Sequence, residues 1–272
     1  MWHDVRIEVP DEAVEHAVRL VAQSATHPFE PRATIELTVL ERDCDDHYML
    51  LDRGDRVTAL RSPREVLDAT FQRVHRRAFE LASLLGWVRF HGAVARIGST
   101  RLVLAGRSSS GKTTLAAAIL ASGGVVEADE SFLTRDGRVV AVPRRWHVRP
   151  PTIDLLPRAA WMLDAPLLPA EPPLRMVDPT EHGFEWSLED GPVDGVVVLM
   201  AGEDLHAAVG DLKGPEVARA LIDESFPVTE PRAAVVRHAS ALALRSPGYA
   251  LRGHAPSPIE MVPILAALGR SH

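Results

Sequence analysis

The chain has 272 residues, of which 46% are hydrophobic, and its 30 basic and 37 acidic residues give a formal net charge of −7 at pH 7. This balance predicts a globular protein and argues against a nucleic-acid partner. The single cysteine, Cys44, excludes an internal disulfide, and no apolar run approaches the roughly 20 residues that span a membrane. The N-terminus lacks the basic and apolar segments of a signal peptide, so we expect a cytoplasmic protein without a membrane partner.

Four short runs of β-favouring residues, separated by Pro, Asp and Gly, occupy the first sixty positions and predict a small, mainly β N-terminal unit. The runs cover residues 4–9, 34–40, 47–52 and 56–60. Residues 43–47, DCDDH, carry side chains that could bind a metal, but their crowding favours an exposed acidic turn.

A long helix is expected next. Ser62 suits the N-cap, Pro63 the first helical position, and Glu65 the reciprocal capping position, while apolar residues continue at helical spacing through Leu85. The helix bridges into a second unit, so the predicted units are residues 1–85 and 86–272.

The second unit opens with a predicted β-hairpin, HGAVARI and RLVLA, joined by Gly98-Ser99-Thr100. Its second strand leads into GRSSSGKTT, and an Ala- and Leu-rich helix follows. A strand at 125–128 and a second hairpin turning at Asp136-Gly137 come next.

The rest of the chain predicts a mixed α/β domain. A proline-rich stretch at 143–179 favours ordered loop and edge structure, and the apolar run GVVVLM at 195–200 suits a strand buried on both faces. Further elements are expected as helices at 214–225, 231–244 and 257–269 and a strand at 249–252.

GRSSSGKTT matches the phosphate-binding pattern G-x-x-x-x-G-K-[ST], although lysine is scarce: Lys112 and Lys213 are the only lysines among the 30 basic residues. A glycine-rich turn between a strand and a helix directs backbone N–H groups and the helix dipole at one anion. We expect Lys112 to reach the β- and γ-phosphates of ATP and Thr113 to bind Mg²⁺. The expected nucleotide-binding residues are Gly106, Arg107, Ser108, Ser109, Ser110, Gly111, Lys112, Thr113 and Thr114. The alternative is a Ser/Gly loop that only caps a helix.

Asp129 and Glu130 follow the strand VVEA, where a P-loop kinase needs an acidic group for Mg²⁺ or for the acceptor proton. They could instead be ordinary charges at a strand end, and Glu203-Asp204 after GVVVLM is a weaker candidate pair. No LSGGQ-like or NKxD-like segment indicates a transporter ATPase or a GTPase.

Taken together, His91-Gly92, the hairpin, GRSSSGKT, its helix, Gly124 and ADE resemble the catalytic domain of the HPr serine kinase/phosphorylase family, which is related in fold to ATP-dependent phosphoenolpyruvate carboxykinase. The resemblance covers residues 85–150 well, 190–269 only in the order of elements, and the N-terminal unit not at all. It implies the transfer of the γ-phosphoryl group of ATP to a serine hydroxyl.

Carried onto this chain, the resemblance implies that Lys112 and Thr113 hold phosphate and Mg²⁺, that Asp129 is a base or a metal ligand, and that His91 lies near the γ-phosphate. On its own, His91 would suit a surface or hydrogen-bonded position. The second acid is Glu130 here, where the family has aspartate, so its part in binding metal is open. The glycine-rich segment of bifunctional members has no counterpart, which implies a kinase without phosphorylase activity.

The segment PRRWHVRP places Arg144, Arg145 and Arg149 near one another, as contacts for a phosphoryl group or an acidic acceptor, or as solvated charges. The leading hypothesis is an ATP- and Mg²⁺-dependent kinase acting on a serine of a protein or peptide, including ribosomally made precursors. The alternatives are a small-molecule kinase and a non-catalytic nucleotide-binding regulatory subunit. Assembly into a homo-oligomer is left open.

Overall fold

The computed structural model divides the chain into two compact units, Met1–Leu85 and Gly86–His272, which are described separately. The residues that the structure describes are 3–8, 33–40, 48–52, 55–142, 144–168, 173–182, 184, 189–200, 208–225, 231–252 and 258–268. The acidic turn expected at 43–47 and the pair Glu203-Asp204 lie outside these ranges.

Among its described residues, the first unit contains a four-stranded sheet and one long helix. The sheet runs in the order β1-β2-β3-β4, with β1 parallel to β2 and the other neighbours antiparallel. Its strands are β1 (His3–Glu8), β2 (Ala33–Leu40), β3 (Tyr48–Asp52) and β4 (Asp55–Leu60).

Helix α2 (Pro63–Leu84) begins at Ser62, whose Oγ accepts a hydrogen bond from the Glu65 N–H at 3.2 Å. The helix is tied to the sheet through Asp52, a buried carboxylate that pairs with Arg73 and Arg77. Burial alone would raise the pKa of Asp52, but the hydrogen bonds from the two arginines lower it below its ordinary value. These bonds link the end of β3 to the middle of α2.

The second unit is built on a six-stranded mixed sheet in the order β15-β16-β14-β7-β6-β8. Strand β14 lies parallel between β7 and β16, which explains why its sequence is a continuous apolar run. The strands are β6 (Ala93–Ile97), β7 (Thr100–Gly106), β8 (Val125–Ala128), β14 (Gly195–Met200), β15 (Ala208–Leu212) and β16 (Gly248–Arg252).

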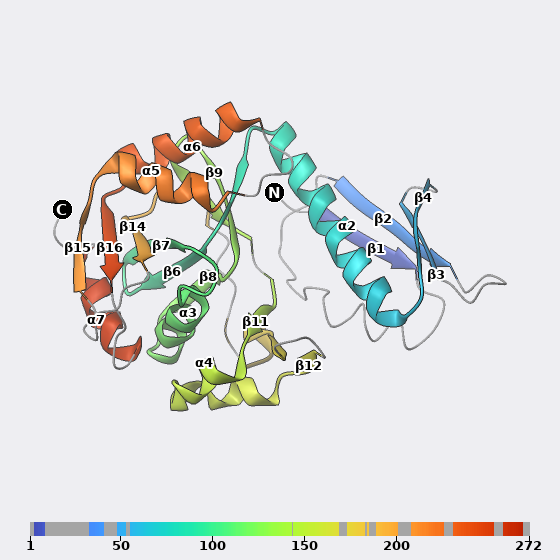
Figure 1. Ribbon diagram of the computed structural model, residues 1–272, viewed down its shortest axis with the longest axis horizontal. Coiled ribbons are helices and arrows are strands. Elements are labelled where there is room, and N and C mark those ends of the chain that lie inside the picture. The colour runs from blue at the N-terminus through green and yellow to red at the C-terminus, as the bar shows by residue number, and fades with distance from the viewer. Residues whose placement is uncertain are drawn as a thin grey trace. The chain divides into compact units, whose positions relative to one another are not determined.

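Helices cover both faces of this sheet (Figure 1). Helices α3 (Lys112–Ala121) and α7 (Pro258–Leu268) pack on one face, and α5 (Gly214–Asp223) and α6 (Arg232–Arg245) pack on the other. Each face has its own buried apolar cluster, so the sheet forms the middle layer of the unit.

A smaller sheet, β10-β9-β5, extends the cluster beneath α5 and α6. It consists of β5 (Val88–His91), β9 (Ser131–Arg135) and β10 (Arg138–Ala141). The proline-rich stretch packs on the α3 side and contains more regular structure than expected. Its elements are β11 (Trp146–Val148), α4 (Pro150–Asp154), the 3₁₀ helix η1 (Pro157–Asp164), β12 (Leu167–Leu168), β13 (Leu174–Val177) and the 3₁₀ helix η2 (Pro179–His182).

The structure corrects one predicted strand. The run HGAVARI is divided at Gly92, because β5 pairs with β9 while β6 pairs with β7 and β8. A Cβ atom on Gly92 would lie 2.7 Å from the Leu104 carbonyl oxygen and 2.9 Å from the Phe132 ring, so the chain changes sheets at a point where only glycine fits. His91 therefore ends β5.

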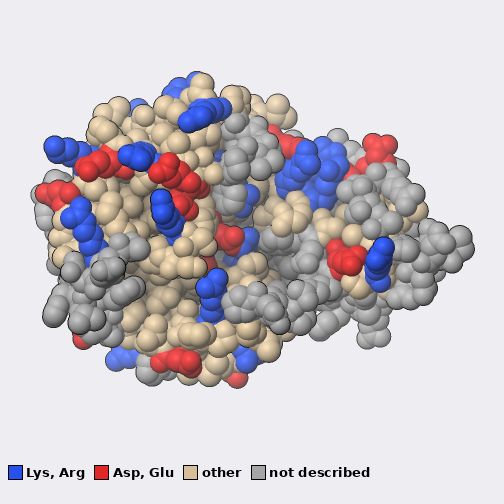
Figure 2. Space-filling view, in the orientation of Figure 1, with Lys and Arg blue, Asp and Glu red and all other residues tan. Residues whose placement is uncertain are grey.

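Strand β15 was not expected, because it is a mostly solvent-facing edge strand without an apolar pattern. Figure 2 shows acidic and basic side chains interspersed on the face in view. The absence of a nucleic-acid partner, which the net charge indicates, stays a prediction. Within the described ranges, no helix combines the length and the apolar character that a membrane crossing requires.

Candidate phosphate-binding site

The loop after β7 has a backbone path that its glycines make possible. Gly106 and Gly111 have φ angles of 141° and 96°, and Ser109 between them has a φ of 64°. A Cβ on Gly106 would lie 2.5 Å from the Leu199 carbonyl oxygen on the neighbouring strand. The loop thus turns tightly against β14 before it enters α3.

The N-terminus of α3 carries no side-chain cap; its N-cap residue is Gly111, and the apolar body of the helix is buried in the unit. The amide groups of the first helical turn are therefore directed at the loop. The Ser110 Oγ, which is buried within the loop, has no hydrogen-bond partner among the described residues. Both features suit an anion held by the loop.

Lys112 is buried, and its Nζ donates hydrogen bonds to the carbonyl oxygens of Gly106 (2.5 Å) and Arg107 (2.9 Å). Burial lowers the pKa of Lys112, while the nearby carboxylates of Glu224 and Asp129 oppose that change. The ammonium group is therefore held against the loop and feels the charge of two carboxylates.

Asp129 follows β8 and is almost fully buried, with 5% of its surface exposed. The Thr113 hydroxyl donates a hydrogen bond to Asp129 Oδ2 at 3.2 Å, whereas Asp129 Oδ1 has no hydrogen-bond partner among the described residues. Burial raises the pKa of Asp129 to about 6, against the opposing effects of Arg144, Thr113 and Lys112. A buried carboxylate with one unsatisfied oxygen is costly unless a cation or proton occupies that position.

Glu130 forms an ion pair with the buried Arg144. Burial lowers the pKa of Arg144 to about 10, and burial together with Arg144 lowers the pKa of His147 to about 4. The Arg144 Nη2 and the His147 Nδ1 are 3.3 Å apart. Arg144 thus joins Glu130 to His147 and contributes positive charge beside Asp129.

His91 and Glu224 meet at the edge of the same site. The His91 Nδ1 lies 3.2 Å from Glu224 Oε2, and the His91 N–H donates to the Glu224 carbonyl oxygen at 3.1 Å. Burial and then Lys112 lower the pKa of His91, and Glu224 opposes them. No local sequence pattern indicates Glu224, because it follows α5 and is 133 residues away from His91 in the chain.

The other two arginines of PRRWHVRP have different positions. Arg149 lines the site, and its Nη1 donates to Ser109 Oγ at 3.5 Å. Arg145 is not among the residues that line the site; it pairs with Asp178 at 3.3 Å and Glu181 at 2.8 Å.

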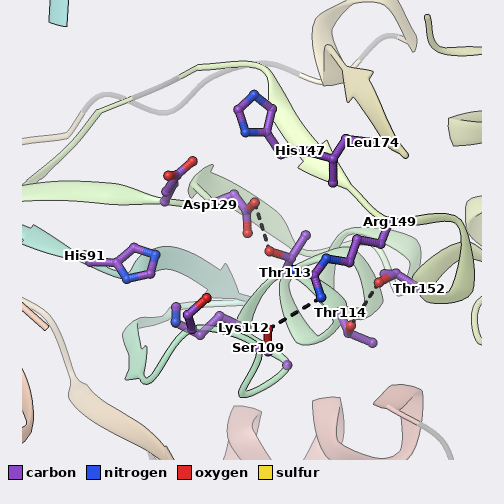
Figure 3. Close-up of a pocket in the computed structure, with 13 residues that line it drawn as sticks. His91, Ser109, Lys112, Thr113, Thr114, Asp129, His147, Arg149, Thr152 and Leu174 are labelled. Atoms are coloured by element: carbon purple, nitrogen blue, oxygen red, sulfur yellow. Dashed lines mark hydrogen bonds between the residues drawn. The ribbon is translucent and has the colours of Figure 1, made fainter. Parts of the chain in front are cut away.

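The site is a cavity of about 350 Å³, whose lining includes His91, Lys112, Asp129, Glu130, His147 and Arg149 (Figure 3). His91, Lys112 and Asp129 face the same space. The opposite wall is formed by β11 and α4, which contribute His147 and Thr152. Among the nine predicted nucleotide-binding residues, those that line the cavity are Ser108, Ser109, Gly111, Lys112, Thr113 and Thr114. The remaining three, Gly106, Arg107 and Ser110, line a second cavity of about 400 Å³ beneath the loop, together with the end of β14.

No protein-family model matches the chain, and no curated protein matches it. Among solved structures, the chain is similar to the HPr(Ser) kinase/phosphatase from Coxiella burnetii, with 10% sequence identity and a TM-score of 0.35. The match covers 68% of this chain and 95% of the other. The function proposed below therefore depends on the residues of the site itself.

Proposed function

We propose that the protein is an ATP- and Mg²⁺-dependent kinase that transfers the γ-phosphoryl group to a hydroxyl group. The observation that carries the proposal is the pairing of Thr113 with Asp129, whose second oxygen is buried and unsatisfied, at the uncapped N-terminus of α3. An anion site and a cation site thus lie side by side, which is what a phosphoryl-transfer site requires.

The loop fits a triphosphate. Its glycine path brings backbone amides close to one point, no side chain caps the helix, and the Ser110 hydroxyl needs a partner. Lys112 is bonded to two loop carbonyls, and a phosphate would offer its ammonium group stronger, charged acceptors. We assign the β- and γ-phosphates to these groups.

The residues also fit Mg²⁺, which usually takes one or two carboxylates and completes its coordination with water and phosphate oxygens. Among the described residues, no group of three or more His, Cys, Asp or Glu could hold a metal. We assign the metal to Thr113 and Asp129, because Glu130 is already paired with Arg144. Bound there, Mg²⁺ would neutralise charge on the phosphates.

For the acceptor, we propose a serine of a protein or peptide, including a ribosomally made precursor. The sequence resemblance described above supports this choice. A small molecule with a hydroxyl group is the alternative acceptor. We expect no phosphorylase activity.

The nucleotide assignment predicts that Lys112→Ala weakens the binding of a fluorescent ATP analogue in the presence of Mg²⁺ by about 100-fold, because one charged contact to the phosphates is lost. The chain's other lysine, Lys213, is exposed and provides a matched control, so Lys213→Ala should bind like the wild type. Equal affinity for the wild type and Lys112→Ala would exclude the phosphate assignment.

The acceptor can be identified by mixing the protein with Mg²⁺, ATP and serine-containing peptides encoded beside its gene, and then measuring ADP release and the intact mass of each peptide. A peptide that gains one phosphate supports a peptide kinase. A parallel panel of small hydroxyl compounds tests the alternative. ATP binding without transfer to any acceptor would favour a regulatory subunit.

A further inference from the structure

The cavity has a second end that takes no part in the assignments above. Three residues line it: Arg149 and Thr152, where β11 gives way to α4, and Leu174 at the start of β13. Hydrogen bonds join Arg149 to Ser109 of the phosphate loop and Thr152 to Thr114 of α3 (Figure 3). We call Arg149, Thr152 and Leu174 together the α4 wall.

We infer that the α4 wall binds the nucleoside of the nucleotide. The hydroxyl groups of Thr152 and Thr114 bind the ribose, and Arg149 and Leu174 hold the base. This inference rests on the proposed nucleotide-binding function, because it places the second half of the ligand whose phosphates the loop holds. The α4 wall is then the part of the site that distinguishes a nucleotide from other polyphosphates.

The direction of the triphosphate leads to this wall. The β- and γ-phosphates and Mg²⁺ are assigned to Lys112, Thr113 and Asp129. Thr114 is the next residue of α3, and its Oγ1 lies 3.3 Å from the Thr152 Oγ1 on the wall. A nucleotide that extends from the metal along the first turn of α3 therefore arrives at these two hydroxyl groups.

The two threonine hydroxyls have hydrogen-bonding capacity left for a ligand. Each hydroxyl has one proton and two lone pairs. Within the described ranges, the contact between Thr114 and Thr152 is the one side-chain hydrogen bond that either makes, and it uses one proton and one lone pair. The second proton and further lone pairs match the hydroxyl groups of a ribose, which both donate and accept.

Arg149 and Leu174 form one surface beside these hydroxyls. Strands β11 and β13 are antiparallel, and the register that pairs Val148 with Arg175 places Arg149 across from Leu174. Residues directly opposite one another in such a pair have their side chains on the same face. A planar guanidinium stacks on aromatic rings and an apolar side chain covers them, so this surface suits the face of a base.

The α4 wall is fixed to the core of the unit, as a specificity site requires. Val148 and Ile153, which flank Arg149 and Thr152, are 0% and 3% exposed and belong to the apolar cluster that contains the buried side of α3. The Thr152 N–H also donates to the Arg149 carbonyl oxygen at 2.9 Å. Arg149 and Thr152 are therefore held in place beside the phosphate loop.

The second cavity, beneath the loop, is a less suitable place for the nucleoside. Its lining includes Asp223 and Glu224, whose negative charges oppose an incoming nucleotide, although Arg107 lies there too. Thr113 and Asp129, the residues assigned to the metal, line the first cavity and not the second. A nucleoside in the second cavity would lie on the far side of the loop from the metal.

Calorimetric binding measurements test the inference without an acceptor. With Mg²⁺ present, the wild type should bind ATP about 10-fold or more tightly than inorganic tripolyphosphate, because only ATP reaches the α4 wall. Arg149→Lys keeps the charge but loses the planar group, so its affinity for ATP should fall about fivefold while that for tripolyphosphate stays within about twofold. Arg158→Lys, at an exposed position on η1, is the matched control and should bind both ligands like the wild type.

The ribose contact is tested by a double comparison. The wild type should bind ATP about fivefold more tightly than 2′,3′-dideoxy-ATP, and Thr152→Val should bind the two alike. A Thr152→Val variant that favours ATP as strongly as the wild type does would exclude this contact.

Methyl NMR spectra locate the base directly. The Leu174 methyl signals, assigned with a Leu174→Ile variant, should shift in the ring current of the adenine when ATP is added, and should not shift with tripolyphosphate. The methyl group of Met200, which lines the second cavity, should shift with neither ligand. A ring-current shift at Met200 in place of Leu174 would overturn the inference.

Two further outcomes separate this inference from the proposed function. Equal affinities of the wild type for ATP and tripolyphosphate would overturn the nucleoside assignment and leave the phosphate site standing. Failure to bind either ligand would overturn the nucleotide-binding function itself, and the inference with it.

Discussion

Asp129→Asn is expected to reduce phosphoryl transfer by about 10³-fold or more, because the neutral amide neither holds Mg²⁺ nor balances the charge of Lys112. The substitution preserves the size of the side chain and an oxygen that can still accept the Thr113 hydroxyl. The loss would therefore come from the missing charge and not from a changed shape. ADP release and the Mg²⁺ dependence of nucleotide binding measure it.

The same substitution should make the protein more stable at neutral pH. Burial raises the pKa of Asp129 from 3.8 to about 6, so the unfolded chain ionises at a lower pH than the folded protein. Ionisation begins to oppose folding as the pH rises through 3.8, the pKa of the unfolded chain. The full cost, about 3 kcal/mol, is present above pH about 6, the pKa of the folded protein. Asparagine removes this cost, which corresponds to a melting temperature higher by about 5 °C or more.

The pH dependence distinguishes this explanation from a general packing effect. The stability gain of Asp129→Asn should be largest at pH 7 to 8 and shrink as the pH falls from about 6 towards 4. Asp164→Asn, at an exposed position at the end of η1, should show no gain at any pH. A variant less stable than the wild type at pH 8 would mean that the buried carboxylate is a net stabilising group.

Local signals in the sequence located much of the fold. Asp136 and Gly137 both have positive φ angles, 53° and 75°, as a two-residue hairpin turn requires, and the Ser62 cap starts α2 at the predicted residue. Such features depend on neighbouring residues alone. The pairing of β5 with β9 depends on residues about forty positions apart, and no local pattern encodes it.

In the candidate site, too, local patterns indicate some residues and miss those that depend on long-range contacts. The loop from 106 to 114 is contiguous, so its pattern identifies it, and Asp129 follows from its position after a strand. Glu224 reaches His91 only because α5 ends beside β5, which no pattern near either residue indicates. Arg144 and Arg145 are adjacent in sequence, yet one pairs with Glu130 beside the cavity and the other with Asp178 away from it, which their sequence alone does not distinguish.

Arg101→Ala is expected to lower the free energy of unfolding by about 3 to 5 kcal/mol, because it leaves the buried Glu127 carboxylate with only the longer 3.3 Å contact to Arg96 as an ion pair. Arg101 is 2% exposed and Glu127 is fully buried, and their closest contact is 2.6 Å. The same guanidinium donates to the carbonyl oxygens of four further residues, which would lose these bonds: Val139, Glu189, Gly191 and Pro192. Denaturant unfolding of the purified variant measures the loss.

Arg138→Ala is the matched control, because Arg138 pairs with Asp190 on the surface, where the two side chains are 50% and 45% exposed, and the expected cost is about 1 kcal/mol or less. A similar cost for the two variants would contradict the importance of the buried network.

In the double variant Arg101→Ala, Glu127→Ala, the loss of stability should be smaller than the sum of the losses in the two single variants, since the buried carboxylate is removed together with its partner. Arg101 and Glu127 lie on β7 and β8, the strands that end at the phosphate loop and at Asp129. Stability lost there should also weaken ATP binding, whereas Arg138→Ala should leave it intact.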